Sequence, residues 1–339
     1  MNLHERIELL SKLGDQLPGD EYLEAIFHRT SFHNPWFTFE NQKKALEAIV
    51  AQFLSKEKLE HWVSRYPEIS GANKKTVGLI LAGNIPFVGM HDLISVFISG
   101  HKSKIKLSEK DAFVLPYLVE KMKKINPEAA TYFEIVEMLK DFDAAIATGS
   151  NNSGRYFEAY FKKYPSIIRK NRNSVAVLTG EESDAELLAL GSDIFQYFGL
   201  GCRNVSKLYV PENYDLEKLL EILHEYKSVA LHEKYKNNFD YNFAMLTLNK
   251  VPFLFSGSIL LIEDESLNSR IASLHFEKYA SLQNIENQLI EKSNELQCVV
   301  GKPGIFEKIE TTPFGKTQSP TLFDYADGVD TLAFLVALK

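Results

Sequence analysis

The chain of 339 residues is long enough for two globular domains, and its 45% hydrophobic and 24% charged residues exclude a disordered or fibrous protein. Its formal net charge of −7, spread without long runs of one sign, argues against nucleic acid as the main partner, because phosphate binding requires a basic surface. No stretch approaches the roughly 20 apolar residues of a transmembrane helix, and the polar N-terminal residues form no signal-peptide core.

The apolar spacing predicts helices over the first roughly 70 residues. From Thr76 onward, short β-rich runs alternate with longer amphipathic runs. Strands are expected at residues 76–82, 104–107, 144–147 and 175–178, followed in turn by helices at 88–99, 112–123, 156–161 and 185–198. This alternation predicts βαβ units and parallel sheets.

A polar turn, Thr179-Gly180-Glu181-Glu182-Ser183, separates two of these β/α runs and marks the expected domain boundary. We expect a first domain over residues 1–178, a second over 179–305, and a C-terminal return segment over 306–339. The apolar run at residues 331–338 is expected to form a strand. An exposed strand of this kind favours aggregation, so we expect it to join a sheet within the chain or across a homodimer interface.

Several well-known site motifs are missing. The sequence has no G-x-x-x-x-G-K-[ST] and no H-E-x-x-H, and its nine histidines are scattered, so neither a P-loop nor a metal site is expected. The segment closest to G-x-G-x-x-G begins at Gly199, but it lacks the third glycine and follows a predicted helix instead of a strand.

Cys202 is the candidate nucleophile. It follows Gly199-Leu200-Gly201, where glycines allow a close backbone approach to a ligand, and Arg203 beside it would favour the thiolate. The alternative is a small buried apolar residue, which is the expected state of Cys298 in its strand-like run. Two cysteines so far apart argue against a disulfide framework, and we expect a cytoplasmic protein.

Three further segments follow predicted strands at their carboxyl ends, where ligands bind in open α/β sheets. The segment Gly83-Asn84-Ile85-Pro86 could direct an amide N–H into a crevice, and Thr148–Gly154 could hold a phosphate at a helix N-terminus. The segment Lys104–Glu109 combines cations with an acid, which could bind a nucleotide ribose and phosphate. Each also has an ordinary structural interpretation: a turn, a helix cap and a solvated charge cluster.

The order of these segments resembles the succession of motifs in the aldehyde dehydrogenase superfamily. The resemblance implies an α/β fold with a helical N-terminal segment and two domains with mostly parallel sheets. Residues 1–178 would hold the dinucleotide on a Rossmann variant that does not use G-x-G-x-x-G, and residues 179–305 would be catalytic. The implied catalytic residues are Cys202 as nucleophile and Asn84 as oxyanion donor. The implied cofactor-binding residues are Lys106, Ser108, Glu109, Thr148, Gly149, Ser150 and Gly154.

Within the superfamily, the chain looks most like the acyl-CoA reductases of the bacterial bioluminescence type, the LuxC family, over roughly residues 30 to 325. Asn34-Pro35-Trp36-Phe37-Thr38 is similar to that family's N-terminal signature, and residues 81–89 are similar to its A-G-N-x-P-x-x-G segment. Aldehyde-oxidising members have a glutamate that activates water. Val177 stands at that place here, and Pro252–Gly257 lacks the acid of a second family segment.

The resemblance therefore implies reduction of a long-chain acyl-CoA or acyl-carrier thioester to an aldehyde through a Cys202 acyl-enzyme. The implied cofactor is NADPH, with NADH as an alternative, and the implied assembly is a homodimer or a higher homo-oligomer. Asn84, Gly149 and Cys202 would then converge in one cleft. Two other functions remain open: an acyl-phosphate reductase on the same scaffold, and a non-catalytic acyl-binding protein that binds no nicotinamide.

Overall fold

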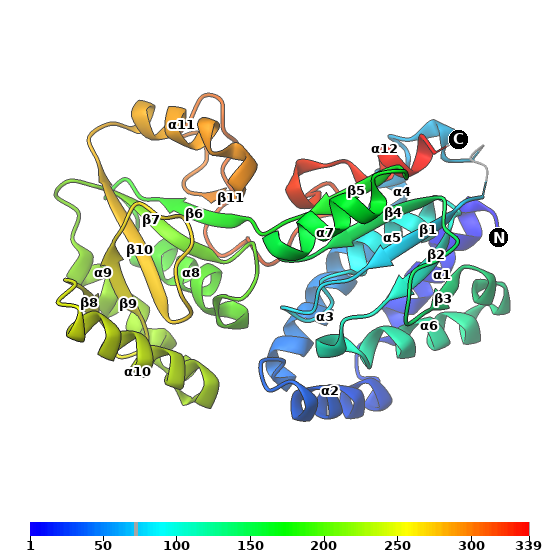
Figure 1. Ribbon diagram of the computed structural model, residues 1–339, viewed down its shortest axis with the longest axis horizontal. Coiled ribbons are helices and arrows are strands. Elements are labelled where there is room, and N and C mark those ends of the chain that lie inside the picture. The colour runs from blue at the N-terminus through cyan, green and yellow to red at the C-terminus, as the bar shows by residue number, and fades with distance from the viewer. Residues whose placement is uncertain (71–73, 339) are drawn as a thin grey trace. The chain divides into compact units, whose positions relative to one another are not determined.

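The computed structural model describes residues 1–70 and 74–338 (Figure 1). Its contacts divide the chain into two compact units: unit 1 comprises Met1–Asn171 and Ser319–Lys339, and unit 2 comprises Arg172–Gln318. Each unit holds one sheet with helices against it, and the sheets are almost entirely parallel. The predicted α/β fold class with two mostly parallel sheets is confirmed. None of the helices in the described ranges is long and apolar enough to cross a membrane.

Unit 1 begins with a helical segment, as the apolar spacing predicts. Its helices are α1 (Leu3–Gln16), α2 (Glu21–His33), α3 (Phe39–Phe53) and α4 (Lys56–Val63). Side chains cap three of them at their first turns: Asn2, which forms a capping box with Glu5, then Asp20 and Thr38.

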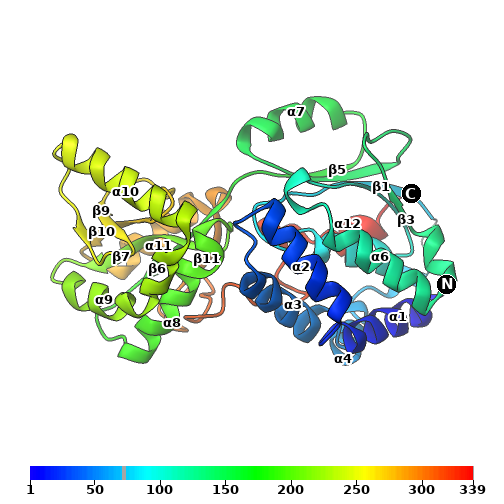
Figure 2. The ribbon, with the colours of Figure 1, turned by 90° about the horizontal axis from the view of Figure 1, so that it is seen from below.

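The sheet of unit 1 has the strand order β3-β2-β1-β4-β5, and the described neighbours in it pair in parallel. Its strands are β1 (Thr76–Ile80), β2 (Lys102–Lys106), β3 (Phe133–Ile135), β4 (Ala144–Thr148) and β5 (Ser166–Arg169). The connecting helices are α5 (Met90–Ile98), α6 (Val114–Ile125) and α7 (Asn151–Phe161). The strand order reverses between β1 and β4, so α7 lies on one face of the sheet and α6 on the other (Figure 2).

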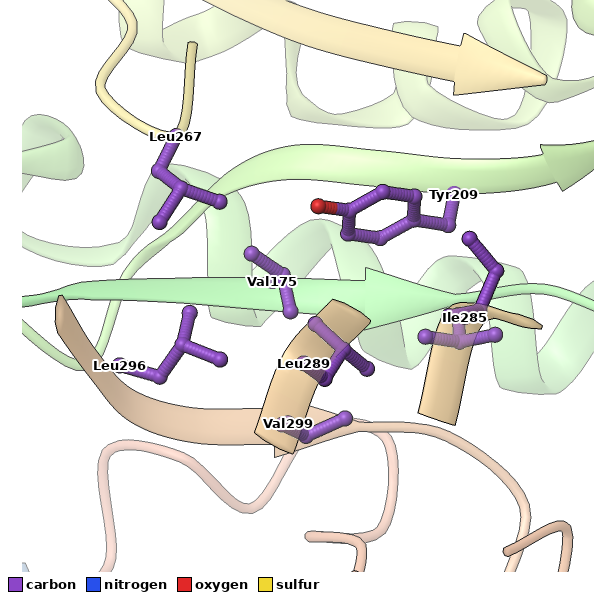
Figure 3. Close-up of a cluster of buried hydrophobic side chains, with 8 residues drawn as sticks. Val175, Tyr209, Leu267, Ile285, Leu289, Leu296 and Val299 are labelled. Atoms are coloured by element: carbon purple, nitrogen blue, oxygen red, sulfur yellow. The ribbon is translucent and has the colours of Figure 1, made fainter. Parts of the chain in front are cut away.

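The sheet of unit 2 has the order β11-β6-β7-β10-β9-β8, in which only the β8–β9 pair is antiparallel. Its strands are β6 (Asn173–Val177), β7 (Val205–Pro211), β8 (Leu254–Phe255), β9 (Leu260–Glu263), β10 (Ser273–Tyr279) and β11 (Leu296–Val300). Its helices are α8 (Asp184–Phe195), α9 (Leu216–Leu223), α10 (Glu233–Leu248) and α11 (Leu282–Glu291). Figure 3 shows Val175 and Tyr209 packed with Ile285 and Leu289 of α11 in a buried apolar cluster.

Short 3₁₀ helices complete the fold. They are η1 (Pro67–Ser70), η2 (Glu109–Asp111), η3 (Pro127–Thr131), η4 (Gln196–Gly199), η5 (His224–Leu231), η6 (Ser293–Glu295) and η7 (Ala326–Gly328).

The observed units correct two expectations about the chain's organisation. The boundary lies between Asn171 and Arg172 and not after Leu178, because β6 pairs with β7 and β11 of unit 2. The return segment also divides: residues 306–318 stay with unit 2, and 319–339 belong to unit 1.

The expected C-terminal strand is wrong, because residues 331–336 form the helix α12 (Thr331–Val336). Asp330 caps this helix by accepting a hydrogen bond from the Ala333 N–H at 2.8 Å. Leu332 and Leu335, one helical turn apart, are fully buried, whereas Ala333 between them is exposed. The helix packs against α5 within unit 1, so the two leucines of the apolar run are buried without joining a sheet.

Candidate active site

The turn after β1 presents Asn84 at the carboxyl end of that strand. Asn84 is exposed, while Gly83 before it is buried against the next loop, where an added Cβ would overlap the Ser108 hydroxyl. At the other end of the turn, Phe87 has a left-handed backbone with φ 59° and a buried ring that contacts the Phe27 ring edge-on at 5.9 Å. The turn is therefore held on both sides of Asn84.

The residues after β2 lie at the same sheet edge, but the lysines on this strand have structural contacts. Lys106 Nζ donates to the Glu137 carbonyl at 3.0 Å, and Lys104 Nζ donates to the Lys140 carbonyl at 2.7 Å. Ser108 caps η2 by accepting from the Lys110 N–H at 3.3 Å, and Glu109 is exposed. Ser108 thus lies beside Gly83 of the Asn84 turn, and the Lys106 amine is directed to the loop after β3.

The segment after β4 opens α7. Gly149 donates its N–H to the Arg169 carbonyl at 3.1 Å, and the Ser150 hydroxyl caps the helix by accepting from the Ser153 N–H at 3.2 Å. An added Cβ at Gly149 would lie 2.9 Å from Phe157 and Ser153, so the glycine lets the strand end pack closely on the helix. Gly154 is buried in the same way against the Lys170 side chain.

The turns after β1 and β4 lie at the position where ligands bind in open α/β sheets. β1 and β4 are neighbours at the point where the strand order reverses, and ligands bind outside the carboxyl ends of the strands at such points. A helix N-terminus there favours phosphate through its dipole and unpaired N–H groups, and glycines at Gly83 and Gly149 keep the turns close to the sheet. Thr148, the last residue of β4, is half-buried at this edge.

Cys202 lies in unit 2, in the loop between η4 and β7, and is half-buried. The backbone just before it is unusual, because Tyr197, Phe198 and Gly199 have φ values of 54°, 59° and 74°. Such left-handed conformations are costly for non-glycine residues and persist only where the surroundings impose them. The Cys202 carbonyl accepts a hydrogen bond from the Ser174 hydroxyl at 2.9 Å, which ties the loop to β6.

Asn204 bonds residues on both sides of this left-handed segment, a role that the sequence alone did not indicate. Its side chain is 3% exposed, and its Oδ1 accepts from the Gly201 N–H at 2.8 Å. Its Nδ2 donates to the carbonyls of Asp193 at 2.9 Å and Gln196 at 2.8 Å. The signal in the sequence was an asparagine just after a glycine-rich helix end, a residue type that commonly bonds nearby backbone groups.

Arg203 contacts the second cysteine, and its expected effect on the Cys202 thiolate stays a prediction. Its Nη1 donates to the Cys298 sulfur at 3.3 Å. Cys298 lies in β11 and is buried, with 8% of its surface exposed, which is the state expected for it.

Asn84 belongs to unit 1 and Cys202 to unit 2, and their expected convergence stays a prediction. Val177, which the resemblance places at the position of the hydrolytic glutamate, is fully buried in the apolar cluster of unit 2. Among the described residues, no group of three or more His, Cys, Asp or Glu side chains could hold a metal ion.

No protein-family profile matches the sequence, and no curated protein matches it. Solved structures match it closely in fold. Aldehyde dehydrogenase 21 from Physcomitrella patens, in complex with succinate, is 15% identical with a TM-score of 0.67 over 90% of this chain and 74% of that chain. An NAD-dependent aldehyde dehydrogenase from Sinorhizobium meliloti is 14% identical with a TM-score of 0.63 over 94% and 72% of the two chains. The NAD+ complex of an aldehyde dehydrogenase from Bacillus cereus is 15% identical with a TM-score of 0.60 over 88% and 70%. The chain therefore has an aldehyde-dehydrogenase-like α/β fold.

Proposed function

We propose that the protein is an NAD(P)H-dependent reductase that converts an acyl thioester to an aldehyde through an acyl-enzyme on Cys202. The observation that carries the proposal is the Cys202 loop, which a buried Asn204 and three successive left-handed residues hold in a strained conformation. Strain of this kind is concentrated at functional sites. A cysteine so placed in this fold is better explained as a nucleophile than as a small core residue.

Reduction is favoured over hydrolytic oxidation by the surroundings of Val177. This side chain is 0% exposed among apolar neighbours, so no carboxylate stands there to activate a water molecule. A reductase needs no such water, and an acyl-enzyme that met one would lose its acyl group as the free acid. The proposed reaction therefore matches both the cysteine that is present and the glutamate that is missing.

In the proposed reaction, the Cys202 thiolate attacks the thioester carbonyl carbon and forms a new C–S bond. The C–S bond to the carrier then breaks, and the carrier leaves as a thiolate that takes up a proton. The negative oxygen of the tetrahedral intermediate accepts hydrogen bonds from the Asn84 side-chain amide and the Cys202 N–H. Loss of one such donor typically lowers kcat by about 10²- to 10³-fold.

The reduced nicotinamide, when bound, supplies the hydride for the acyl carbon. In the proposal, the α7 N-terminus at Thr148, Gly149 and Ser150 receives the cofactor phosphates, and Gly154 allows the close packing of this helix. The adenosine ribose binds to the segment that contains Lys106, Ser108 and Glu109. We propose NADPH as the cofactor. Cys202 then leaves the reduced carbon as a thiolate when the thiohemiacetal releases the aldehyde.

Intact-mass measurement after incubation with palmitoyl-CoA and no reductant tests the proposal. We expect one acyl adduct, mapped to Cys202, that persists until NADPH is added and is then converted to aldehyde. Cys202→Ser should form no adduct, because a hydroxyl without an activating base is a much poorer nucleophile. Cys298→Ser is the matched control and should acylate as the wild type does.

Three results would contradict the proposal. Acylation of Cys202→Ser at an undiminished rate would place the nucleophile elsewhere, and an adduct that NADPH does not discharge would indicate a non-catalytic acyl-binding protein. Turnover of an acyl phosphate without turnover of acyl-CoA would identify the alternative substrate class on the same scaffold.

A further inference from the structure

A small cavity lies at the carboxyl ends of β1 and β2, directly behind the turn that carries Asn84. Its volume of about 20 Å³ has room for one water molecule. The walls are apolar side chains from the ends of both strands, from α5 and from α6, and the polar lining comes from Ser108 and Asp111. The cavity belongs to unit 1 alone.

Asp111 is an unusual residue for this environment. Its Oδ1 is sealed from solvent and accepts no hydrogen bond from any residue that the structure describes. Burial raises the pKa of this carboxyl group to about 6, and only the Phe87 N–H, which donates to Oδ2 at 3.4 Å, acts against that increase. A buried carboxyl group with half of its hydrogen-bonding capacity unused lowers stability, so its presence requires another explanation.

The charged groups on the surrounding elements do not compensate Asp111. Glu109 and Lys110, beside it on η2, are exposed, and Lys106 donates to the Glu137 carbonyl. Asp92 on α5 pairs with Arg169. The polar group that Asp111 does contact is the backbone of the Asn84 turn.

Asp111 contacts the turn through the backbone N–H of Phe87. Phe87 is the third residue after Asn84, its left-handed φ of 59° is unfavourable for a side chain of its size, and its ring is anchored against Phe27. The Asp111 carboxyl group accepts the Phe87 N–H. Ser108, at the start of the same short loop, packs against Gly83 on the other side of Asn84. The loop 108–111 thus supports both ends of the turn.

We propose that Asp111 is a positioning residue, which holds the Phe87 backbone and thereby fixes the Asn84 side chain for the oxyanion. This inference rests on the proposed function, because it assigns Asp111 a role in that reaction. An oxyanion donor must be held within about 0.5 Å of its productive position, and a strained turn needs a second contact to achieve this. Asp111 supplies that contact.

Two measurements on Asp111→Ala and Asp111→Asn test the inference. In Asp111→Ala, amide hydrogen exchange in residues 83–90 should become at least about fivefold faster, because the turn loses its hydrogen-bond acceptor. The rate of Cys202 acylation at saturating acyl-CoA should fall about 10- to 100-fold with KM unchanged, since orientation of the oxyanion donor acts in the transition state. Asp111→Asn keeps an acceptor oxygen, so its amide exchange at residues 83–90 and its acylation rate should stay close to those of the wild type.

Asp143→Ala is the matched control. Asp143 also accepts a backbone N–H in the same sheet, that of Thr76 at 2.7 Å, but at the opposite end of β1. This variant should loosen the start of β1 and leave residues 83–90 and acylation unchanged. If Asp111→Ala does not fold, Asp111→Leu, which fills the cavity, takes its place in the same comparison.

Unchanged exchange at residues 83–90 in folded Asp111→Ala, or in Asp111→Leu where it takes its place, would overturn the inference, whatever the activity. A loosened turn with an undiminished acylation rate would overturn it as well. If the wild type itself forms no acyl-enzyme, the proposed function fails, and the exchange measurement alone then decides whether Asp111 holds the turn.

Discussion

Asn204 uses both polar atoms of its side chain to join the end of α8 to the loop that carries Cys202. Replacing it with alanine removes these hydrogen bonds inside a buried site and leaves backbone groups unpaired. We expect Asn204→Ala to lower the free energy of unfolding by about 2 kcal/mol, measured by denaturant unfolding.

The control for this prediction is Asn249→Ala. Asn249 is exposed, and its Nδ2 donates to the Met245 carbonyl at 2.9 Å near the end of α10. Water can replace that hydrogen bond, so the cost should stay below about 0.5 kcal/mol. Equal losses in the two variants would show that Asn204 does not hold the Cys202 loop.

The raised pKa of Asp111 predicts an unusual dependence of folding stability on pH. Its pKa is raised from 3.8 to about 6 in the folded chain, so the folded state binds the proton more tightly than the unfolded state. Its contribution is therefore fully present below about pH 4 and is lost as the pH rises toward 6, by an amount on the order of 3 kcal/mol. An asparagine side chain does not titrate, so Asp111→Asn should show none of this particular loss of stability.

The measurement is the difference in unfolding free energy between Asp111→Asn and the wild type at pH 4 and pH 7. We expect the unfolding free energy of Asp111→Asn to increase relative to that of the wild type as the pH rises from 4 to 7. Carboxylates with lowered pKa values, such as Asp20 and Glu134, have the opposite pH dependence, but they are present in both proteins and cancel. A constant difference would show that Asp111 ionises normally in the folded chain.

At the scale of whole elements, α12 closes the core of unit 1. The Thr331 hydroxyl accepts from Arg169 Nη2 at 2.8 Å, and His101 Nε2 lies 2.9 Å from the Leu335 carbonyl. Arg169 also forms a buried ion pair with Asp92 of α5. The helix thus supplies a hydrogen-bond partner to each of two buried side chains, Arg169 on β5 and His101 just before β2.

Replacing Leu332 tests how much α12 contributes to the stability of the folded chain. This leucine is 0% exposed, so Leu332→Ala should lower the unfolding free energy by about 2 to 4 kcal/mol through lost burial and the cavity left behind. Phe32 on α2 is 93% exposed, and Phe32→Ala should change stability by less than about 0.5 kcal/mol. Thermal and denaturant unfolding of both variants checks the prediction, and a mild loss in Leu332→Ala would mean that α12 is not part of the core.

At the scale of the whole molecule, the two units are built differently along the chain. Unit 2 is one continuous segment, Arg172–Gln318, which contains all six strands of its sheet and its own apolar cluster. Unit 1 needs two separate segments, because Ser319–Lys339 returns to it. Tyr325 in that segment accepts from Trp62 Nε1 at 2.7 Å, and its hydroxyl lies 2.6 Å from that of Tyr66.

Fragments of the chain should therefore behave differently. We expect residues 172–318 to fold alone with a cooperative thermal transition, followed by circular dichroism. Residues 1–171 alone should lack such a transition and regain it when a peptide of residues 319–339 is added. Cooperative unfolding of 1–171 without the peptide would show that the return segment is dispensable.

Local patterns were sufficient to predict much of the fold. The expected strands at 76–82, 104–107, 144–147 and 175–178 correspond to β1, β2, β4 and β6, each followed by its helix, because alternation of apolar runs and turn residues is a property of nearby sequence. The turns after β1, β2 and β4 were also expected, since they directly follow those strands. Their meeting at one sheet edge follows from parallel strands. The short strands β3 and β5 were not predicted, because runs of three and four residues carry too little alternation.

Other features depend on packing and hydrogen-bond partners far away in the chain, and the local sequence pattern does not predict them. An uninterrupted apolar run does not distinguish strand from helix, and at residues 331–336 burial against α5 decided for the helix. The strand β6 joins unit 2 because its hydrogen-bond partners are β7 and β11, the latter more than a hundred residues later. Asn204 and Asp111 were missed for the same reason. What makes each of them important is the burial and the set of backbone groups around it, and folding alone brings these together.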